Sequence, residues 1–309
     1  MQGFGSSTVS GLTWGQIPEE LIQLLRIDDS PDRDRSFRHG ITVLSCRPMN
    51  YPPSSFPAAL LATAVELAQV HGILQKSATG AVVHCPLMLS PTVISRDIQT
   101  QLDALTLPSA ALMHGVASDV AFMTEQLQAT ATVDEYIDLL LELAIAEQQV
   151  PSPYRFAVTR SDYFVTPTAT GAALRQVEFN TIAASYLGLS QRIVDFHRLW
   201  GTKTSQDWAL IPNQPVDNVA DSFVEVMAAY GEPTAGVLFV VQAGERNIFD
   251  QRILEAALLQ RGITVTRLDL NAIGSEAKIR DGHLVINGQI MAITYFRAGY
   301  RPDDLQSEL

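Results

Sequence analysis

A carboxylate and a carboxamide stand two residues apart at the end of an alternating apolar segment. Glu178 and Asn180 flank Phe179, so in a strand their side chains share one face. Carboxylate and amide oxygens are ligands that Mg²⁺ prefers, and strand ends carry ligands in α/β folds. The pattern therefore indicates part of a magnesium site. The alternative is that Glu178 pairs with an arginine and Asn180 begins a turn.

Three further segments place polar or flexible residues next to predicted strands. Residues 181–185, TIAAS, open a helix whose free N–H groups suit an anion. Residues 245–251, ERNIFDQ, run from a loop into a helix after an apolar strand, where ligands sit in open parallel sheets. Gly299, within RAGY at 297–300, permits an unusual turn. Plain helix capping is the competing interpretation for the first two segments.

Several common kinds of site are absent from the sequence. It holds no glycine-rich phosphate loop, no dinucleotide fingerprint and no HExxH zinc motif. The six histidines show no ligand spacing, and the two cysteines, Cys46 and Cys85, cannot form a disulfide framework. Without a visible secretory leader or membrane span, the chain is expected to be a reduced, cytoplasmic protein.

Composition narrows the classes of partner. The 309 residues include 21 Lys and Arg against 33 Asp and Glu, a net charge of −12. Such a surface repels phosphate backbones and anionic lipids, so we expect no nucleic-acid and no membrane partner. Charged residues make up only 17%, against ~25% in ordinary domains. This low share favours some apolar surface that meets another domain or subunit.

The first ~150 residues are predicted to be mostly helical. Pro18 begins one helix, and apolar spacing predicts another over 56–76. Residues 40–45 form a short predicted strand. Thr132-Val-Asp-Glu135 is a capping-box pattern that opens a helix over YIDLLLELAIAEQ.

Strands dominate the pattern after residue 154. Two strands, 155–165 and 174–180, are predicted to form a hairpin, and a loop then leads into a helix over 181–200. Residues 202–216 are irregular.

A strand–helix–strand rhythm follows residue 231. Its segments are 237–242, 248–262 and 263–269, which predicts a parallel sheet. The dipeptide Asn287-Gly288 predicts a second hairpin over 283–296. The fold class is therefore α/β, with helices and a hairpin over 1–230 and a βαβ domain over 231–309.

The segments QVEFNTIAASYLGL, ERNIFDQR and YFRAGYRP resemble, in this order, motifs of eukaryotic-type glutathione synthetase, an ATP-grasp ligase. The resemblance is strongest from about Tyr154 to Pro302 and fainter in FPAALLATAVELAQVHGIL and DEYIDLLLELA. Because that family is considerably longer, it implies an ATP-grasp-like fold whose C-terminal part is missing. Residues 1–230 would carry metal and substrate motifs, and 231–309 a truncated substrate-binding domain.

The resemblance also implies roles for individual residues. Glu178 and Asn180 match Mg²⁺ ligands, and Glu178 also lies beside ATP. The positions that match substrate contacts are Arg160, Ile182, Ala183, Ala184, Ser185, Glu245, Gln251, Arg297, Ala298, Gly299 and Tyr300. Ala183 stands where the family commonly has serine, and Ala298 where it commonly has aspartate. No side chain is implied as a nucleophile.

The implied reaction joins γ-glutamylcysteine to glycine through an acyl phosphate, with ATP as co-substrate and Mg²⁺ as cofactor. Charge develops on carboxylate and phosphoryl oxygens, so positioning and electrostatic stabilisation supply most of the catalysis. The implied partners are ATP, γ-glutamylcysteine, glycine and glutathione, and the family forms homodimers.

The positions of the three lysines bear on whether this chain could catalyse the reaction by itself. None of Lys76, Lys203 and Lys278 falls in a motif that matches the family's phosphate-binding lysines. We therefore expect the N-terminal two-thirds of a ligase, inactive on its own. The alternative is a shortened, non-catalytic homologue that binds γ-glutamyl thiol peptides. The βαβ rhythm alone also suggests a Rossmann-type nucleotide module, which the missing glycine-rich fingerprint disfavours.

Overall fold

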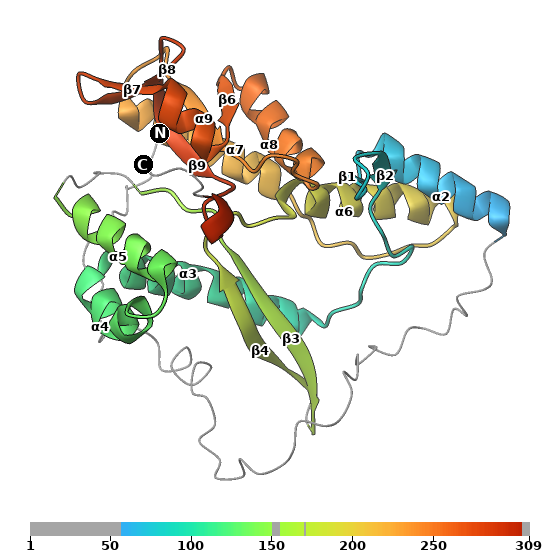
Figure 1. Ribbon diagram of the computed structural model, residues 1–309. Coiled ribbons are helices and arrows are strands. Elements are labelled where there is room, and N and C mark those ends of the chain that lie inside the picture. The colour runs from blue at the N-terminus through green and yellow to red at the C-terminus, as the bar shows by residue number, and fades with distance from the viewer. Residues whose placement is uncertain (1–56, 150–154, 170, 305–309) are drawn as a thin grey trace, which may run out of the picture. The chain divides into compact units, whose positions relative to one another are not determined.

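Two compact units make up the residues that the computed structural model describes, 57–149, 155–169 and 171–304 (Figure 1). Within these, unit 1 comprises 94–149, 161–169 and 171–179, and unit 2 comprises 57–93, 155–160 and 180–304. The helix predicted at Pro18, the strand predicted at 40–45 and Cys46 lie outside the described residues.

Unit 1 consists of three helices and most of a β-hairpin. The helices are α3 (Arg96–Ser118), α4 (Val120–Ala131) and α5 (Glu135–Glu147), and α4 packs against both α3 and α5. Side-chain oxygens of Ser95, Asp119 and Asp134 accept hydrogen bonds from backbone N–H groups in the first turn of these helices. The helical prediction for this part of the chain is confirmed.

The N-cap of α5 differs from the prediction. The carboxylate of Asp134 accepts from the N–H groups of Tyr136 (3.0 Å) and Ile137 (3.2 Å). Thr132 instead ends α4, and its hydroxyl donates to the Ala129 carbonyl (2.8 Å). Because the preceding helix already holds Thr132, the next oxygen-bearing side chain caps α5, and its negative charge suits the helix N-terminus.

The first predicted hairpin is confirmed as β3 (Arg160–Thr168) and β4 (Gly171–Asn180). Both strands run further toward the turn than predicted, whereas residues 155–159 are not in a strand. The hairpin belongs to unit 1 except at its two ends, since Arg160 and Asn180 belong to unit 2.

A five-stranded mixed sheet forms the centre of unit 2. Its order is β6 (Val265–Leu268), β5 (Gly236–Val240), β9 (Gln289–Phe296), β8 (His283–Ile286) and β7 (Ala277–Arg280). Strand β5 pairs in parallel with β6 and β9, while β8 is antiparallel to β9 and β7. The predicted βαβ unit and second hairpin are therefore confirmed, but the hairpin makes the sheet mixed instead of all-parallel.

The two faces of β5 contribute to two different cores, as strand alternation requires. Val237 and Phe239 pack with buried residues of α7 (Pro215–Tyr230) and α8 (Ile248–Gln260). Leu238 and Val240 pack on the opposite side with Ile286, beside apolar residues of α9 (Leu270–Glu276). Burying such side chains stabilises the fold by about 1.5–3 kcal/mol each.

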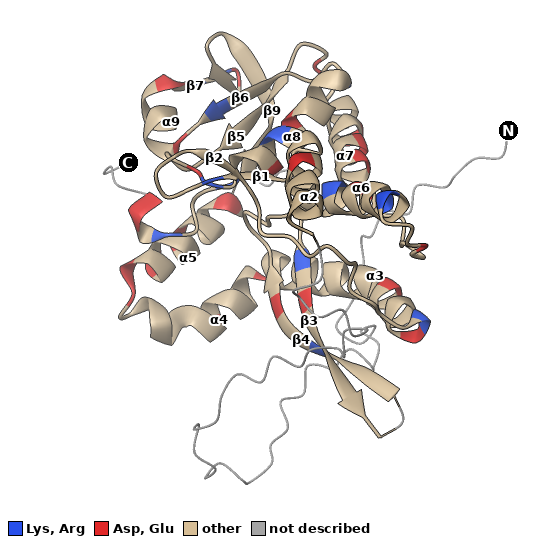
Figure 2. Cartoon of the chain, turned by 90° about the vertical axis from the view of Figure 1, so that its right-hand side faces the viewer, with Lys and Arg blue, Asp and Glu red and all other residues tan. Residues whose placement is uncertain are grey.

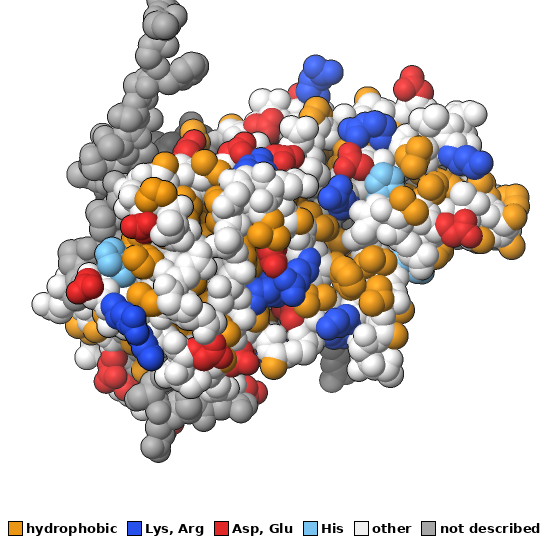
Figure 3. All heavy atoms as spheres, turned by 90° about the horizontal axis from the view of Figure 1, so that it is seen from above, with side chains coloured by type: hydrophobic (Ala, Val, Ile, Leu, Met, Phe, Trp, Pro, Cys, Tyr) orange, Lys and Arg blue, Asp and Glu red, His pale blue; other side chains and the backbone are white. Residues whose placement is uncertain are grey.

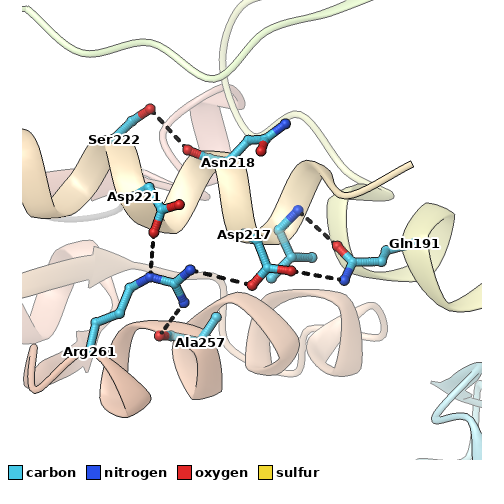
Figure 4. Close-up of polar contacts among 8 residues, drawn as sticks. Gln191, Asp217, Asn218, Asp221, Ser222, Ala257 and Arg261 are labelled. Carbon is cyan, nitrogen blue, oxygen red and sulfur yellow. Dashed lines mark hydrogen bonds and ion pairs between the residues drawn. The ribbon is translucent and has the colours of Figure 1, made fainter. Parts of the chain in front are cut away.

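The domain boundary predicted between residues 230 and 231 stays a prediction. In unit 2, helix α7, which precedes that boundary, packs against α8 and β9, which follow it. An arginine reinforces this packing, since Arg261 donates to Asp217 (3.3 Å) and Asp221 (2.7 Å) of α7 (Figure 4). Gln191 extends the network by donating to Asp217 (3.3 Å) from a third helix.

That third helix is α6 (Leu187–Lys203), which packs on α2 (Ala58–Val70). Phe196 and Trp200 are fully buried in this contact, with ring centroids 6.1 Å apart. The helix predicted over 56–76 ends earlier than expected, because β1 (Leu74–Lys76) pairs with β2 (Val82–His84). Gly72, in the left-handed region with φ 71°, reverses the chain between helix and strand.

Acidic side chains recur along α5 and α7, in agreement with the net charge (Figure 2). On the face seen in Figure 3, basic side chains lie among acidic and apolar ones instead of gathering in one patch. A short 3₁₀ helix, η2 (Pro302–Asp304), ends the described residues.

Candidate functional site

The loop between β4 and α6 contains two residues in the left-handed region. Ala183 has φ 51° and Tyr186 has φ 73°, although neither is glycine. Such conformations cost on the order of 1 kcal/mol or more each and persist only where surrounding contacts impose them. The loop contains all four predicted substrate residues Ile182–Ser185, of which Ala184 is buried and Ile182 exposed.

Two arginines impose the path of this loop. Arg297, which is only 3% exposed, donates from Nη1 to the Ala184 carbonyl and from Nη2 to Ser185 Oγ (3.1 Å). Arg160 donates to the Ser185 carbonyl (3.3 Å), and its guanidinium lies 5.6 Å from the centre of the Tyr186 ring. Two arginines far apart in the sequence thus meet at one pair of loop residues.

One nitrogen atom of the Arg297 guanidinium makes no hydrogen bond within the described part of the chain. Its Nε atom is buried and has no hydrogen-bond partner among the described residues. A buried N–H group without an acceptor costs about 1–3 kcal/mol.

A buried carboxylate holds the other end of the loop. Asp250, 3% exposed in the first turn of α8, accepts from the N–H groups of Tyr186 (2.7 Å) and Leu189 (2.9 Å). It therefore caps the first turn of α6 from a distant part of the sequence. We did not predict this role, because an acid in the first turn of a helix is usually explained by its own helix dipole.

Glu245 and Gln251 are in direct contact. Gln251 Nε2 donates to one carboxylate oxygen of Glu245 (3.0 Å), and the backbone N–H of Asn247 donates to the other (2.7 Å). Gln251 is almost fully buried. The pair therefore forms a fixed polar edge where the loop after β5 enters α8.

The turn after β9 is organised by a residue that we did not predict. The carboxylate of Asp304 accepts from the N–H groups of Gly299 (2.8 Å) and Tyr300 (3.3 Å) and from Gln242 Nε2 (2.9 Å). Gly299 has φ 93°, which a side chain would oppose. Ala298, in contrast, is buried in the apolar cluster of Leu238 and Val240.

A cavity of about 900 Å³ lies within unit 2. Ser185 and Glu245 line it together with Tyr186 and Asn247, but Arg160 and residues 297–300 do not. Its opposite wall comes from segment 73–92, to which the sequence assigned no role. Cys85 lies in that wall, and burial, followed by the nearby charge of Asp250, raises the pKa of its thiol.

The two predicted metal ligands lie at the end of β4. Glu178 is exposed and Asn180 half-buried, and the border between unit 1 and unit 2 falls between them. Their oxygen donors are of the type that Mg²⁺ takes. Among the described residues, no three acidic, histidine or cysteine side chains converge as a metal site. The chemistry of the two donors fits Mg²⁺, and their role as metal ligands stays a prediction.

Known proteins identify the class to which this fold and loop arrangement belong. A sequence model described as "Eukaryotic glutathione synthase, ATP binding domain" matches residues 54–279. The chain is 31% identical over 251 residues to the glutathione synthetase of Homo sapiens, covering 77% of this chain and 53% of that protein. It is 35% identical over 235 residues to the chloroplastic enzyme of Solanum lycopersicum, covering 73% and 43%.

The chain therefore belongs to the eukaryotic glutathione synthase family. It spans about half the length of the curated relatives it matches. A glutathione synthetase-like effector from Globodera pallida shares the fold, with a TM-score of 0.66 and 18% identity over 78% of this chain and 57% of that one. In the described part of this chain, every helix is too short or too polar to cross a membrane.

Proposed function

We propose that this chain supplies the dipeptide site and two metal ligands of a ligase that joins γ-glutamylcysteine to glycine, with ATP and Mg²⁺, through an acyl phosphate. The observation that carries the proposal is the meeting of Arg160 and Arg297 at residues 184–185. Family membership supports the reaction class. The proposed partners are ATP, γ-glutamylcysteine, glycine and glutathione, with a second copy of the chain as a homodimer.

The chain's own residues would bind and orient the dipeptide. The loop that the two arginines and Asp250 hold presents Ser185 at the wall of the cavity, where its hydroxyl can bind a polar group of the substrate. Orienting a carboxylate before its activation lowers the entropic part of the barrier. No side chain needs to act as a nucleophile, because the activated group belongs to the substrate.

Glu178 and Asn180 would hold Mg²⁺ by carboxylate and amide oxygen. Mg²⁺ bound there supplies neutralisation of charge on phosphoryl oxygens. In a protein with the full length of the relatives, we expect Glu178→Gln to lower turnover at least ~100-fold, because a charged ligand is lost. Dipeptide binding should change little, and near-normal turnover with ordinary Mg²⁺ dependence would contradict the assignment.

Titration of the 309-residue chain with γ-glutamylcysteine tests the dipeptide site. We expect a Kd on the order of 0.1–10 mM, because part of a site lacks the preorganisation of a complete one. Inorganic phosphate release with ATP and glycine should stay at background, since the three lysines fall in no matching motif. Absence of dipeptide binding would overturn the proposal, whereas binding with turnover would show that this chain alone completes the site.

A further inference from the structure

Arg267 on β6 forms a hydrogen bond with Gln251, one of the residues predicted to contact the substrate. Its Nη2 donates to Gln251 Oε1 (2.6 Å), and its Nη1 donates to Glu255 Oε2 (3.3 Å). The side chain is 12% exposed, and the guanidinium lies 5.8 Å from the centre of the Phe239 ring. The motifs that we singled out in the sequence do not include this arginine.

The position of Arg267 fixes the orientation of the Gln251 carboxamide. A guanidinium can only donate hydrogen bonds, and an ionised carboxylate can only accept them. Gln251 lies between one of each, Arg267 and Glu245. Only the orientation with Oε1 toward Arg267 and Nε2 toward Glu245 satisfies both partners. Exchanging the two ends would set donor against donor and acceptor against acceptor.

This orientation determines what Gln251 offers to a ligand. One of its two amide N–H groups is used by Glu245. The second amide N–H remains as a donor, while Arg267 takes one of the two acceptor positions of the oxygen. A donor at this position recognises an acceptor, which in a γ-glutamyl dipeptide is a carboxylate or a peptide carbonyl.

We propose that Arg267 is a positioning residue, which orients the Gln251 carboxamide so that position 251 presents an N–H donor to an acceptor group of the dipeptide. This inference rests on the proposed function, because it takes Gln251 as a dipeptide contact. A purely structural role for Arg267 is the competing explanation. Glu255, its other partner, keeps a second cation without it, since Arg252 donates to Glu255 at 2.5 Å.

A double-mutant cycle separates the two explanations. Dipeptide affinity is measured for the 309-residue chain, for Arg267→Met, for Gln251→Ala and for the double variant. We expect Arg267→Met to weaken γ-glutamylcysteine binding about fivefold or more, but less than about twofold when Gln251 is already alanine. Arg267→Lys, which retains a charged N–H donor group, should recover part of the loss. Independent, multiplying effects in the cycle would overturn the positioning role.

Arg261→Met is the matched control, because it removes an arginine with two carboxylate partners from the same unit without touching Gln251. We expect it to lower thermal stability and leave dipeptide affinity within about twofold. An equal loss of affinity in this control would contradict a specific role for Arg267.

A measurement without ligand keeps the inference separate from the proposed function. The side-chain amide protons of Gln251, observed by NMR, should be ordered in the unmodified chain and mobile in Arg267→Met. Unchanged order would overturn the inference even if the chain binds dipeptide. Failure of the unmodified chain to bind, with order lost in the variant, would overturn only the proposed function and confirm the orienting contact.

Discussion

Buried polar side chains in unit 2 are concentrated where the loop after β5 enters α8. Asp250, Gln251 and Glu255 are each less than 10% exposed, and each has a hydrogen-bond partner outside its own helix. Burying such groups is tolerated only when they are paired. This face of α8 is therefore the place where single substitutions should have the largest effects on both stability and binding.

Asp250→Asn tests that expectation at one residue. The carboxamide keeps one acceptor but brings an N–H₂ group against a backbone N–H of the α6 first turn. We expect a loss of about 1–3 kcal/mol of unfolding free energy, measured by denaturant titration, and weaker dipeptide binding.

The control for Asp250 is Asp269→Asn, at a residue that caps α9 through one bond to the Ala272 N–H (2.8 Å). It should cost about 1 kcal/mol or less and leave binding unchanged. Equal effects of the two substitutions would argue against a special role for Asp250.

His197 makes the stability of unit 2 sensitive to acid. It is 7% exposed, its Nε2 donates to the Met88 carbonyl (2.9 Å), and burial lowers the pKa of its imidazole below the ordinary 6.5. The unfolded chain therefore takes up this proton more readily than the folded one, so stability is present above the ordinary pKa and falls as the pH drops below it.

Urea unfolding at neutral and mildly acidic pH measures this effect. We expect His197→Gln to be less stable at neutral pH but to lose less stability on acidification than the unmodified chain. Carboxylates titrate in both chains. The difference between the two pH profiles of stability therefore reports the contribution of His197. Parallel pH profiles would contradict the assignment.

Sequence reasoning predicted the contacts of this site only in part. The arginines, loop and Glu245–Gln251 pair were found through motif resemblance, and the structure brings Arg160, Ser185 and Arg297 together. Asp250, Arg267 and Asp304 were not found. Each acts on backbone or side chains distant in sequence, so neither periodicity nor local spacing carries a signal for its partner. The roles of the predicted residues toward substrate stay predictions.

At the scale of elements, local chemistry explains which predictions were confirmed. Asn287 and Gly288 adopt φ 52° and 81°, the conformation of a primed two-residue turn that their residue types favour. Strands β1 and β2 were missed because each has only three residues, too few for alternation to show. Strand β1 also contacts the loop after β5, since Lys76 N–H donates to the Arg246 carbonyl (2.9 Å).

Two glycine-to-alanine substitutions test how backbone conformation affects stability. One is expected to lower the free energy of unfolding and the other to raise it. At Gly288 an added Cβ has no atom within 4 Å, so only the left-handed backbone opposes it. We expect Gly288→Ala to lower unfolding free energy by about 1–2 kcal/mol. Gly115, inside α3, has equally open surroundings without a positive φ, and its replacement should raise stability by about 0.5–1 kcal/mol.

Denaturant curves on both variants measure the two changes. A stabilised Gly288→Ala, or a destabilised Gly115→Ala, would show that surroundings outweigh backbone conformation at these positions.

At the scale of the whole chain, the two units differ in the amount of core that the structure describes. Of the buried apolar residues, unit 1 contains Ile98, Val120, Leu141 and Leu174. Unit 2 contains all the others that the structure describes, and most of these gather in three clusters around β5, β8 and α6. Apolar burial is the main favourable term in folding, so the free energy of opening should be unequal along the chain.

Native-state hydrogen exchange followed by mass spectrometry tests this inequality. We expect amides of α3, α4 and α5 to exchange through openings of low free energy, and those of β5 and β9 only through near-global unfolding. Strand β5 is the strongest case, because all five of its residues are buried and both its neighbours are parallel strands.

A dipeptide ligand should raise protection in residues 181–189 and 245–251 but leave α3–α5 unchanged, because all the loop-holding contacts of Arg297 and Asp250 belong to unit 2. Uniform protection across both units would contradict the argument from core size, and ligand-induced protection confined to α3–α5 would contradict the placement of the site.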